Sequence, residues 1–198
     1  MKLEVRDARA GDLPEVKRLI DEYIAVDYYS LEELEALLHG DQNLFYVVTD
    51  ADRSNAIVSY FYAFLSGLDE ALEKLHVRQK PEALLEYGPD TPVGVYKTSS
   101  TAADYQKHGI CSSFISGLEP TFRKRGAKML LATALKPIGQ GVPMEHIFLK
   151  HGFTAIAQVS RPWVDMLLYC PYCNRNHCIC DAVFYMKRLD ETEGGELV

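Results

Sequence analysis

Four of the five cysteines lie close together near the end of the chain. They form a CxxC pair, Cys170 and Cys173, and a CxC pair, Cys178 and Cys180. A CxxC turn aims two sulfur atoms at one point, and a second pair can complete a tetrahedron of soft ligands. Disulfide frameworks instead spread their cysteines along the chain to close long loops. The cluster therefore favours a metal site over disulfides.

We expect this metal to be a structural zinc ion, since four protein ligands leave no open position for water. His177 could replace Cys178 or Cys180 as a ligand, because the segment between the two pairs is short. Free thiols, a labile redox pair and an iron–sulfur site are also compatible with this cysteine spacing.

A second stretch, residues 101–112, has the chemistry of a phosphate-binding loop. It joins an expected strand to an expected helix, whose N-terminus offers unpaired backbone N–H groups and a positive dipole end to an anion. Gly109 allows close approach of the backbone, and Lys107 and His108 add positive charge. By spacing alone, an ordinary turn that contains a glycine explains the stretch equally well.

Two motifs in this part of the chain resemble those of the GNAT superfamily of N-acetyltransferases. The first is Gln106-Lys107-His108-Gly109-Ile110-Cys111, preceded by Tyr105, which matches the family pattern Gln/Arg-x-x-Gly-x-Gly/Ala. The second is Phe148-Leu149-Lys150-His151-Gly152-Phe153, which stands where the family has Tyr-x-x-x-Gly-Phe. The order of expected elements also agrees over residues 1–160 and 182–189.

The resemblance implies a mixed sheet splayed around its fourth and fifth strands, with acetyl-CoA in the gap. An amine would attack the thioester directly, so the site must supply a deprotonated amine, an oxyanion donor and a proton for the thiolate. The strand end would contact the acetyl and pantetheine portions, and the start of the next helix would hold the pyrophosphate. The implied cofactor-binding residues are Ser99, Ser100, Thr101, Gln106, Lys107, His108, Gly109, Ile110, Cys111, Ser112 and Phe148.

The chain departs from the family at positions that matter for proton transfer. Phe148 replaces the usual proton-donating tyrosine, and Lys136 stands where some branches have a glutamate base. Local candidates for catalytic roles are Glu145, one turn before Phe148, and Tyr96 on the cofactor-side strand. A solvated helix residue and a packed strand aromatic explain these two residues as well. Proximity and orientation alone supply much of the rate of an acyl transfer.

Cys111 is expected to be a small packed residue at the mouth of the phosphate loop. A route through an acyl-cysteine would need a base that the sequence does not identify.

The N-terminal elements must position one side of this site. Residues 3–6 predict a strand, after which Asp12 and Glu15 have the spacing of a capping box at a helix start. Ser30 and Glu33 repeat this pattern for a second helix. The apolar stripes of the two helices are Leu13, Val16, Leu19, Ile20, Tyr23 and Ile24, and then Leu34, Leu37 and Leu38.

The remaining elements alternate strands with helices. Residues 44–48 and 56–65 are rich in β-formers and predict a hairpin, and residues 66–90 predict a helical insertion whose second helix begins at Pro81. Further strands are expected at 92–101, 128–135 and 182–189, and helices at 109–125 and 143–151. Pro120 predicts a kink or an early end of the helix that contains it. With the resemblance, this order predicts an α/β fold: a GNAT-like mixed, splayed sheet of six to seven strands flanked by helices.

Composition predicts a single domain over residues 1–190 and a disordered tail over 191–198. The 198 residues are 47% hydrophobic and 25% charged, which is enough apolar material for a core. The formal net charge of -7 argues against nucleic-acid binding by phosphate neutralisation. No stretch approaches the roughly 20 apolar residues of a membrane span, and the N-terminus is too polar for a secretory signal. We therefore expect a cytoplasmic chain.

The resemblance implies that the acceptor enters between the first two helices and the last hairpin, which places it beside the cysteine cluster. Residues 21–29 combine carboxylates with aromatics, which suits a cationic amine, and a solvated helix end explains them equally. Trp163, with Arg161 and Pro162, is expected to line the same region. The aromatic run at 56–65 could pair with a second subunit in a homodimer, and an internal strand explains it equally.

The function predicted from the sequence is transfer of an acetyl group from acetyl-CoA to a primary amine of a small molecule or peptide. The alternative is a non-catalytic module that binds CoA or another protein and carries a structural zinc hairpin.

Overall fold

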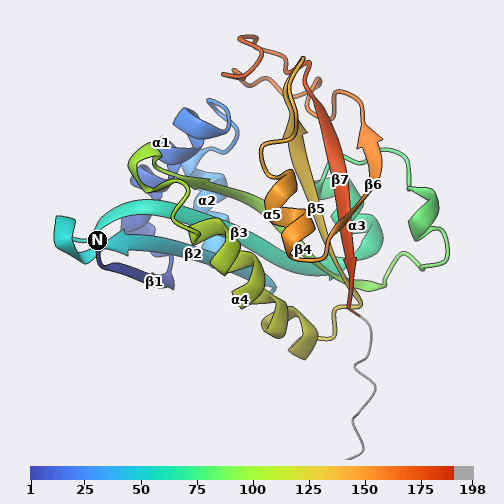
Figure 1. The fold of residues 1–198 in the computed structure, drawn as a ribbon, viewed down its shortest axis with the longest axis horizontal. Helices are drawn as coiled ribbons and strands as arrows, with labels where there is room; N and C mark the ends of the chain where they lie inside the picture. Colours follow the sequence, from blue (N-terminus) through green and yellow to red (C-terminus); the bar gives the residue numbers. More distant parts are fainter. Residues whose placement is uncertain (190–198) are drawn as a thin grey trace, which may run out of the picture.

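The computed structural model describes residues 1–189 and contains one seven-stranded sheet (Figure 1). The strands are β1 (Leu3–Asp7), β2 (Asn43–Asp50), β3 (Ala56–Gly67), β4 (Pro92–Thr101), β5 (Met129–Lys136), β6 (Thr154–Val159) and β7 (Asp181–Arg188). Their order is β1-β2-β3-β4-β5-β7-β6; β4 and β5 run parallel, and the other neighbours are antiparallel. The predicted mixed sheet is confirmed. The tail predicted at 191–198 lies outside the described residues.

Helices cover both faces of the sheet (Figure 1). On one face lie α1 (Leu13–Tyr23), α2 (Leu31–Leu38) and α3 (Leu68–Lys74), and on the other lie α4 (Ile110–Lys124) and α5 (Glu145–Lys150). Each face has its own apolar core, and β3 contributes side chains to both cores, which explains its aromatic run. Because β3 pairs with β2 and β4 on its two edges, this run is an internal strand and leaves no edge for a second subunit.

The parallel strands β4 and β5 separate after a short paired stretch. Residues 93–96 of β4 pair with residues 129–132 of β5. Beyond this point β4 pairs with β3 and β5 pairs with β7, so the two strands diverge. The pairing of β3 with β4 skips Lys97, which makes Lys97 a bulge at the point of separation. A bulge bends a strand and interrupts its pairing, and the predicted splay is therefore confirmed.

Asp12 precedes α1 but does not cap it. Its carboxylate accepts hydrogen bonds of 2.6 and 2.7 Å from the Arg6 guanidinium and one of 2.8 Å from the backbone N–H of Arg9. The predicted capping box at Asp12 is wrong, because a bidentate bond to arginine is stronger than a bond to a neutral amide.

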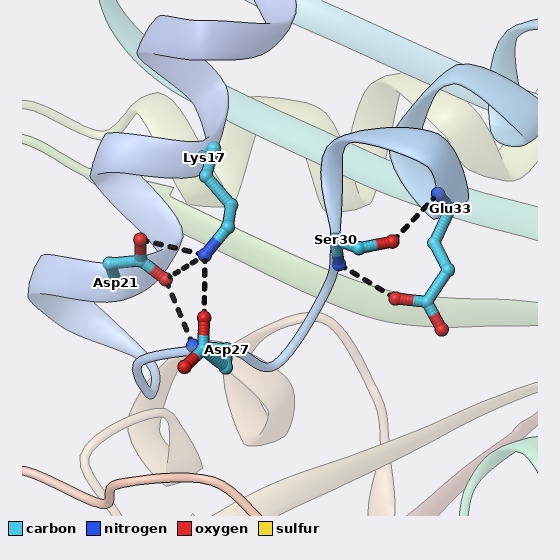
Figure 2. Close-up of polar contacts among 5 residues, drawn as sticks. All are labelled: Lys17, Asp21, Asp27, Ser30 and Glu33. Carbon is cyan, nitrogen blue, oxygen red and sulfur yellow. Dashed lines mark hydrogen bonds and ion pairs between the residues drawn. The ribbon is translucent and has the colours of Figure 1, made fainter.

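The second predicted capping box is confirmed. The N–H of Glu33 donates to the Ser30 hydroxyl at 3.1 Å, and the N–H of Ser30 donates to the Glu33 carboxylate at 2.7 Å (Figure 2). These reciprocal bonds satisfy two backbone donors at the start of α2.

The predicted second helix of the insertion is wrong, and of the two outcomes predicted for Pro120 the early helix end is wrong. The insertion at 66–90 contains α3, and its second helix is a single 3-10 turn, Glu82–Leu84. Pro120 does not end α4, which continues to Lys124. Pro120 lies on the exposed face of α4, where water can bind the carbonyl that loses its partner. Among the described residues, no helix is long and apolar enough to cross a membrane.

Candidate active site

The phosphate loop, residues 101–112, runs from the end of β4 into the first turn of α4. Gly109 is the N-cap residue of α4 and has a φ of +79°. A side chain in this left-handed conformation costs about 1–2 kcal/mol. The space beside Gly109 is open, since an added Cβ would meet no atom within 4 Å. The first turn of α4 has no acidic residue, so its backbone N–H groups and positive dipole end can face an anion.

Hydrogen bonds within and below the loop define its shape. The Gln106 side-chain amide donates to the carbonyl of Thr101 at 2.9 Å, and Nδ1 of His108 lies 2.9 Å from the carbonyl of Gln106. The Tyr105 hydroxyl donates to the buried Asp50 carboxylate at 2.7 Å. The loop is thus anchored to the β2–β3 hairpin while the side chains of Lys107 and His108 remain at the surface.

The first turn of α4 is also tied to α5. The Ser112 hydroxyl lies 2.6 Å from Nε2 of His151, at the end of α5. Burial lowers the pKa of His151, and the neighbouring charges of Lys150 and Lys187 lower it further. Ile110 is buried beneath this turn and Lys107 is exposed. Ser112 thus lies at the junction of α4 with α5.

One pocket opens where β4 and β5 separate, and its walls belong to both faces of the sheet. On the α4–α5 side it is lined by Tyr96, Ser99, Cys111, Ile115, Leu118 and Phe148. On the other side it is lined by Tyr23, Tyr28, Tyr62, Trp163, Leu168 and Cys170. Paired strands lie about 4.8 Å apart and leave no such passage, so the splay creates the pocket. The predicted residues Ser99, Cys111, Phe148 and Trp163 meet here.

The two residues after Ser99 turn their side chains elsewhere. The Ser100 hydroxyl donates to the carbonyl of Leu19 on α1 at 3.2 Å. Thr101 Oγ1 lies 2.8 Å from the hydroxyl of Ser59 on β3. These residues can reach a ligand through their backbone groups only.

Two threonines also line the pocket, Thr98 on β4 and Thr133 on β5. Neither is among the residues predicted from the sequence. Their Oγ1 atoms are buried. Thr133 Oγ1 has no hydrogen-bond partner among the described residues, whereas Thr98 interacts with the hydroxyls of Tyr29 and Tyr60. A buried hydroxyl without a partner is destabilising, so Thr133 is suited to bond a ligand in the gap. Nothing in their spacing marks them, because threonine is common in strands.

The two candidate catalytic residues have different surroundings. The Tyr96 hydroxyl lines the pocket but donates to the carbonyl of Ile115 at 2.6 Å, and burial raises its pKa. Glu145 is exposed at the start of α5, outside the lining of the pocket, and accepts a 3.5 Å bond from Tyr185. Phe148 stacks on the Tyr185 ring at 5.0 Å. The hydroxyls of Tyr96 and Tyr185 are therefore engaged with protein groups.

Cys111 faces the pocket from the first turn of α4. Burial raises the pKa of its thiol to about 11, and a hydrogen bond with Ser99 opposes only part of this shift. Near neutral pH the group is a thiol, which is a weak nucleophile.

The carboxylates at the end of α1 are engaged in ion pairs and do not line the pocket. Asp21 accepts bonds of 2.6 and 2.8 Å from Lys17 and one of 3.2 Å from the N–H of Asp27 (Figure 2). Glu22 pairs with Arg18 at 2.5 Å. From residues 21–29 the pocket is lined by Tyr23, Ile24, Ala25 and Tyr28, and by none of the carboxylates.

Lys97 is the one lysine or arginine among the described residues that line the pocket. Its ammonium donates to the carbonyl of Lys74 and lies 5.6 Å from the centre of the Tyr28 ring. Burial lowers the pKa of the neighbouring His76 to about 4, with Lys97 and Arg78 contributing, so His76 is neutral at pH 7. The positive charge in this half of the pocket therefore comes from Lys97.

The four clustered cysteines meet at one point. The sulfur atoms of Cys170, Cys173, Cys178 and Cys180 all lie within 4.8 Å of one another. Sulfur atoms at about 2.3 Å from one tetrahedral zinc ion are roughly 3.8 Å apart, so small movements would complete such a site. A hydrogen bond from the Cys178 thiol and two backbone N–H groups lower the pKa of Cys170 to about 5.

His177 lies outside this group of ligand atoms. Its Nδ1 is 3.0 Å from the carbonyl of Val164, and its side chain is exposed. The arrangement therefore matches the expected set of four cysteines rather than a mixed set.

Known structures share this fold. No family model and no curated protein matches the sequence. Arabidopsis thaliana NAA60 in complex with acetyl-CoA is similar over 96% of this chain and 100% of its own, with a TM-score of 0.72 and 12% identity. The ribosomal-protein-S18-alanine N-acetyltransferase from Escherichia coli is similar over 100% and 99%, with a TM-score of 0.62 and 13% identity. A GNAT-family acetyltransferase from Streptococcus pneumoniae is similar over 95% and 100%, with a TM-score of 0.61 and 13% identity. This chain therefore has the fold of the GNAT N-acetyltransferases.

Proposed function

We propose that this protein is an acetyl-CoA-dependent N-acetyltransferase that acts on a primary amine of a small molecule or peptide. The observation that carries the proposal is the pocket through the splayed sheet, with the open N-terminus of α4 at one mouth. The phosphate loop would bind the pyrophosphate at Gly109, and the pantetheine arm would run between β4 and α4 to the gap. The amine would enter from the opposite face, beside Tyr23 and Trp163.

In the proposed reaction the amine nitrogen attacks the thioester carbonyl, a C–N bond forms and the C–S bond breaks. The carbonyl oxygen gains negative charge, which backbone N–H groups of β4 beyond Tyr96 can stabilise because that edge has no partner strand. The hydroxyl of Thr133 lies at the gap and can accept a hydrogen bond from the amine. The proton lost by the amine ends on the departing thiolate.

The two lining residues nearest the expected proton-transfer positions, Tyr96 and Phe148, offer no free proton to the gap. Tyr96 already donates to Ile115, and Phe148 has no ionisable proton. We infer that orientation of the two substrates supplies much of the rate, with water carrying protons. The predicted catalytic roles of Glu145 and Tyr96 stay predictions.

We also propose that Cys170, Cys173, Cys178 and Cys180 hold one structural zinc ion. Four buried or half-buried sulfur ligands leave no open coordination position, so the ion would shape the protein rather than activate water. Metal analysis should give one zinc ion per chain. Protein loaded with Co²⁺ should show the visible absorption bands of a tetrahedral thiolate site, and a metal-free purified protein that fails to take up either ion would contradict the proposal.

Calorimetric titration with acetyl-CoA tests the proposed activity. Wild type should bind, and Gly109→Glu should lose binding, because it places bulk and negative charge where the pyrophosphate would lie. Release of CoA thiol in the presence of a panel of amines then measures turnover. Binding without turnover on any amine would favour the non-catalytic module, and no binding by wild type would overturn both the proposed activity and a module that binds CoA.

A further inference from the structure

The metal site lies in a long connection that has little regular structure. This connection, the cysteine loop (residues 160–180), joins β6 to β7 and contains no helix or strand of its own. Loops of this length are uncommon inside compact domains and usually serve a function. Two of the cysteines lie in the middle of the cysteine loop and two at its end, next to β7. A metal bound by all four would hold the middle of the loop close to the start of β7.

The same loop is bonded to the segment that follows α1. Val26 and Tyr169 exchange two backbone hydrogen bonds, of 3.0 and 3.2 Å. The Tyr172 hydroxyl, between the first two cysteines, donates to the carbonyl of Tyr23 at 3.1 Å. Tyr169 lies one residue before Cys170, and Tyr172 lies inside the CxxC turn. Both contacts therefore depend on where the CxxC turn is held.

Residues from both of these segments, the cysteine loop and the segment that follows α1, line the pocket. Cys170, Cys178 and Tyr172 form part of its wall, next to Tyr23 and Tyr28. The phosphate loop lies beyond the splay, at the start of α4, and the metal cluster packs in the core of the opposite face. The N–H of Ala103, near the start of the phosphate loop, donates to the Tyr23 hydroxyl at 3.0 Å, so the two halves meet at Tyr23. A change at the metal should therefore reach the acceptor half of the pocket and leave the first turn of α4 intact.

We infer that metal binding by the four cysteines builds the acceptor half of the pocket, by holding the cysteine loop against residues 23–28. Tyr169 and Tyr172 are positioning residues in this arrangement, and the metal takes no part in bond making. The inference rests on the proposed function for its kinetic consequence. The contact between the two segments is independent of that function and can be measured alone.

Hydrogen–deuterium exchange measures the contact directly. The zinc-loaded protein is compared with chelated protein and with Cys173→Ser. Loss of metal should speed exchange in residues 23–28 as well as in the cysteine loop, with the first turn of α4 unchanged. Cys111→Ser is the control, because it removes a cysteine outside the cluster and should retain one metal ion per chain. Unchanged exchange in residues 23–28 after metal loss would overturn the inference.

Tyr172→Phe tests the contact in a protein that keeps its metal. The variant loses one hydrogen bond, so KM for the amine should rise about two- to tenfold, with the Kd for acetyl-CoA unchanged. If KM for the amine and Kd for acetyl-CoA both rise, or if neither rises, then Tyr172 does not shape the acceptor half of the pocket alone, and the inference is contradicted. If no amine is acetylated by wild type, the proposed function fails, and the exchange experiment still decides whether the metal orders residues 23–28.

Discussion

The Tyr105 hydroxyl donates a 2.7 Å hydrogen bond to the Asp50 carboxylate and so fastens the phosphate loop to the β2–β3 hairpin. The same carboxylate accepts bonds from the backbone N–H groups of Lys2 and Asp52, and the bond from Tyr105 is the largest of the effects that lower its pKa. One buried carboxylate thus connects the N-terminal strands with the predicted cofactor site.

Tyr105→Phe should raise the Kd for acetyl-CoA several-fold, because the ring remains but the loop loses its anchor. Calorimetry gives the Kd, and thermal unfolding shows whether the fold is retained. Tyr60→Phe is the matched control: its buried hydroxyl interacts with Thr98 and Ser100 on β4 and not with the phosphate loop, so the Kd for acetyl-CoA should not rise. Equal effects of the two variants would show that Tyr105 does not act through the loop.

Gly109→Ala should weaken acetyl-CoA binding, and Gly126→Ala should not. Both glycines have positive φ, +79° and +84°, and an added Cβ would meet no atom within 4 Å at either. Each variant should therefore lose about 1–2 kcal/mol of unfolding free energy, measured by urea titration. The two sites differ in that the space at Gly109 is where the pyrophosphate would lie. Similar affinities in both variants would place the cofactor elsewhere.

The Arg6–Asp12 pair should make stability depend on pH. Hydrogen bonds from Arg6, followed by the backbone bond from Arg9, lower the pKa of Asp12 in the folded protein. A lowered folded-state pKa stabilises the protein above the unfolded-state pKa of about 3.9, and this contribution disappears as pH falls through the folded-state value.

Asp12→Asn should therefore lower the unfolding free energy by about 1–2 kcal/mol at pH 7, allowing for the partial exposure of Arg6. The difference from wild type should shrink when urea titrations are repeated below about pH 4. If the difference in unfolding free energy between wild type and Asp12→Asn stays constant over this pH range, the effect comes from a change in packing and not from the charge of Asp12.

Cys111 should not carry the acetyl group. Because burial raises the pKa of its thiol to about 11, alkylation by iodoacetamide should be slow at neutral pH and accelerate toward that value. Mass spectrometry of protein incubated with acetyl-CoA should show no acetyl adduct on the peptide that contains Cys111. An adduct that disappears when an amine is added would instead establish a two-step route.

Some features of this protein follow from its sequence because their signals are local. The capping box of Ser30 and Glu33 joins residues three positions apart, and the phosphate loop occupies twelve consecutive residues around Gly109. The spacing of the cysteines likewise predicts a cluster, since all four lie in one short segment. In each case the atoms that interact are close along the chain, and backbone geometry brings them together.

Tertiary structure decided which partner each group takes. Asp12 bonds to Arg6 instead of capping α1, and Asp21 bonds to Lys17 instead of facing the pocket. Thr98 and Thr133 become neighbours of one gap because β4 and β5 separate. Tyr172 meets Tyr23 across 149 positions of sequence, so the cysteine cluster and the segment after α1 form one wall of the pocket. Such contacts depend on how the strands pair and diverge. Residue spacing along the chain does not encode the spatial distance between side chains from different strands and helices.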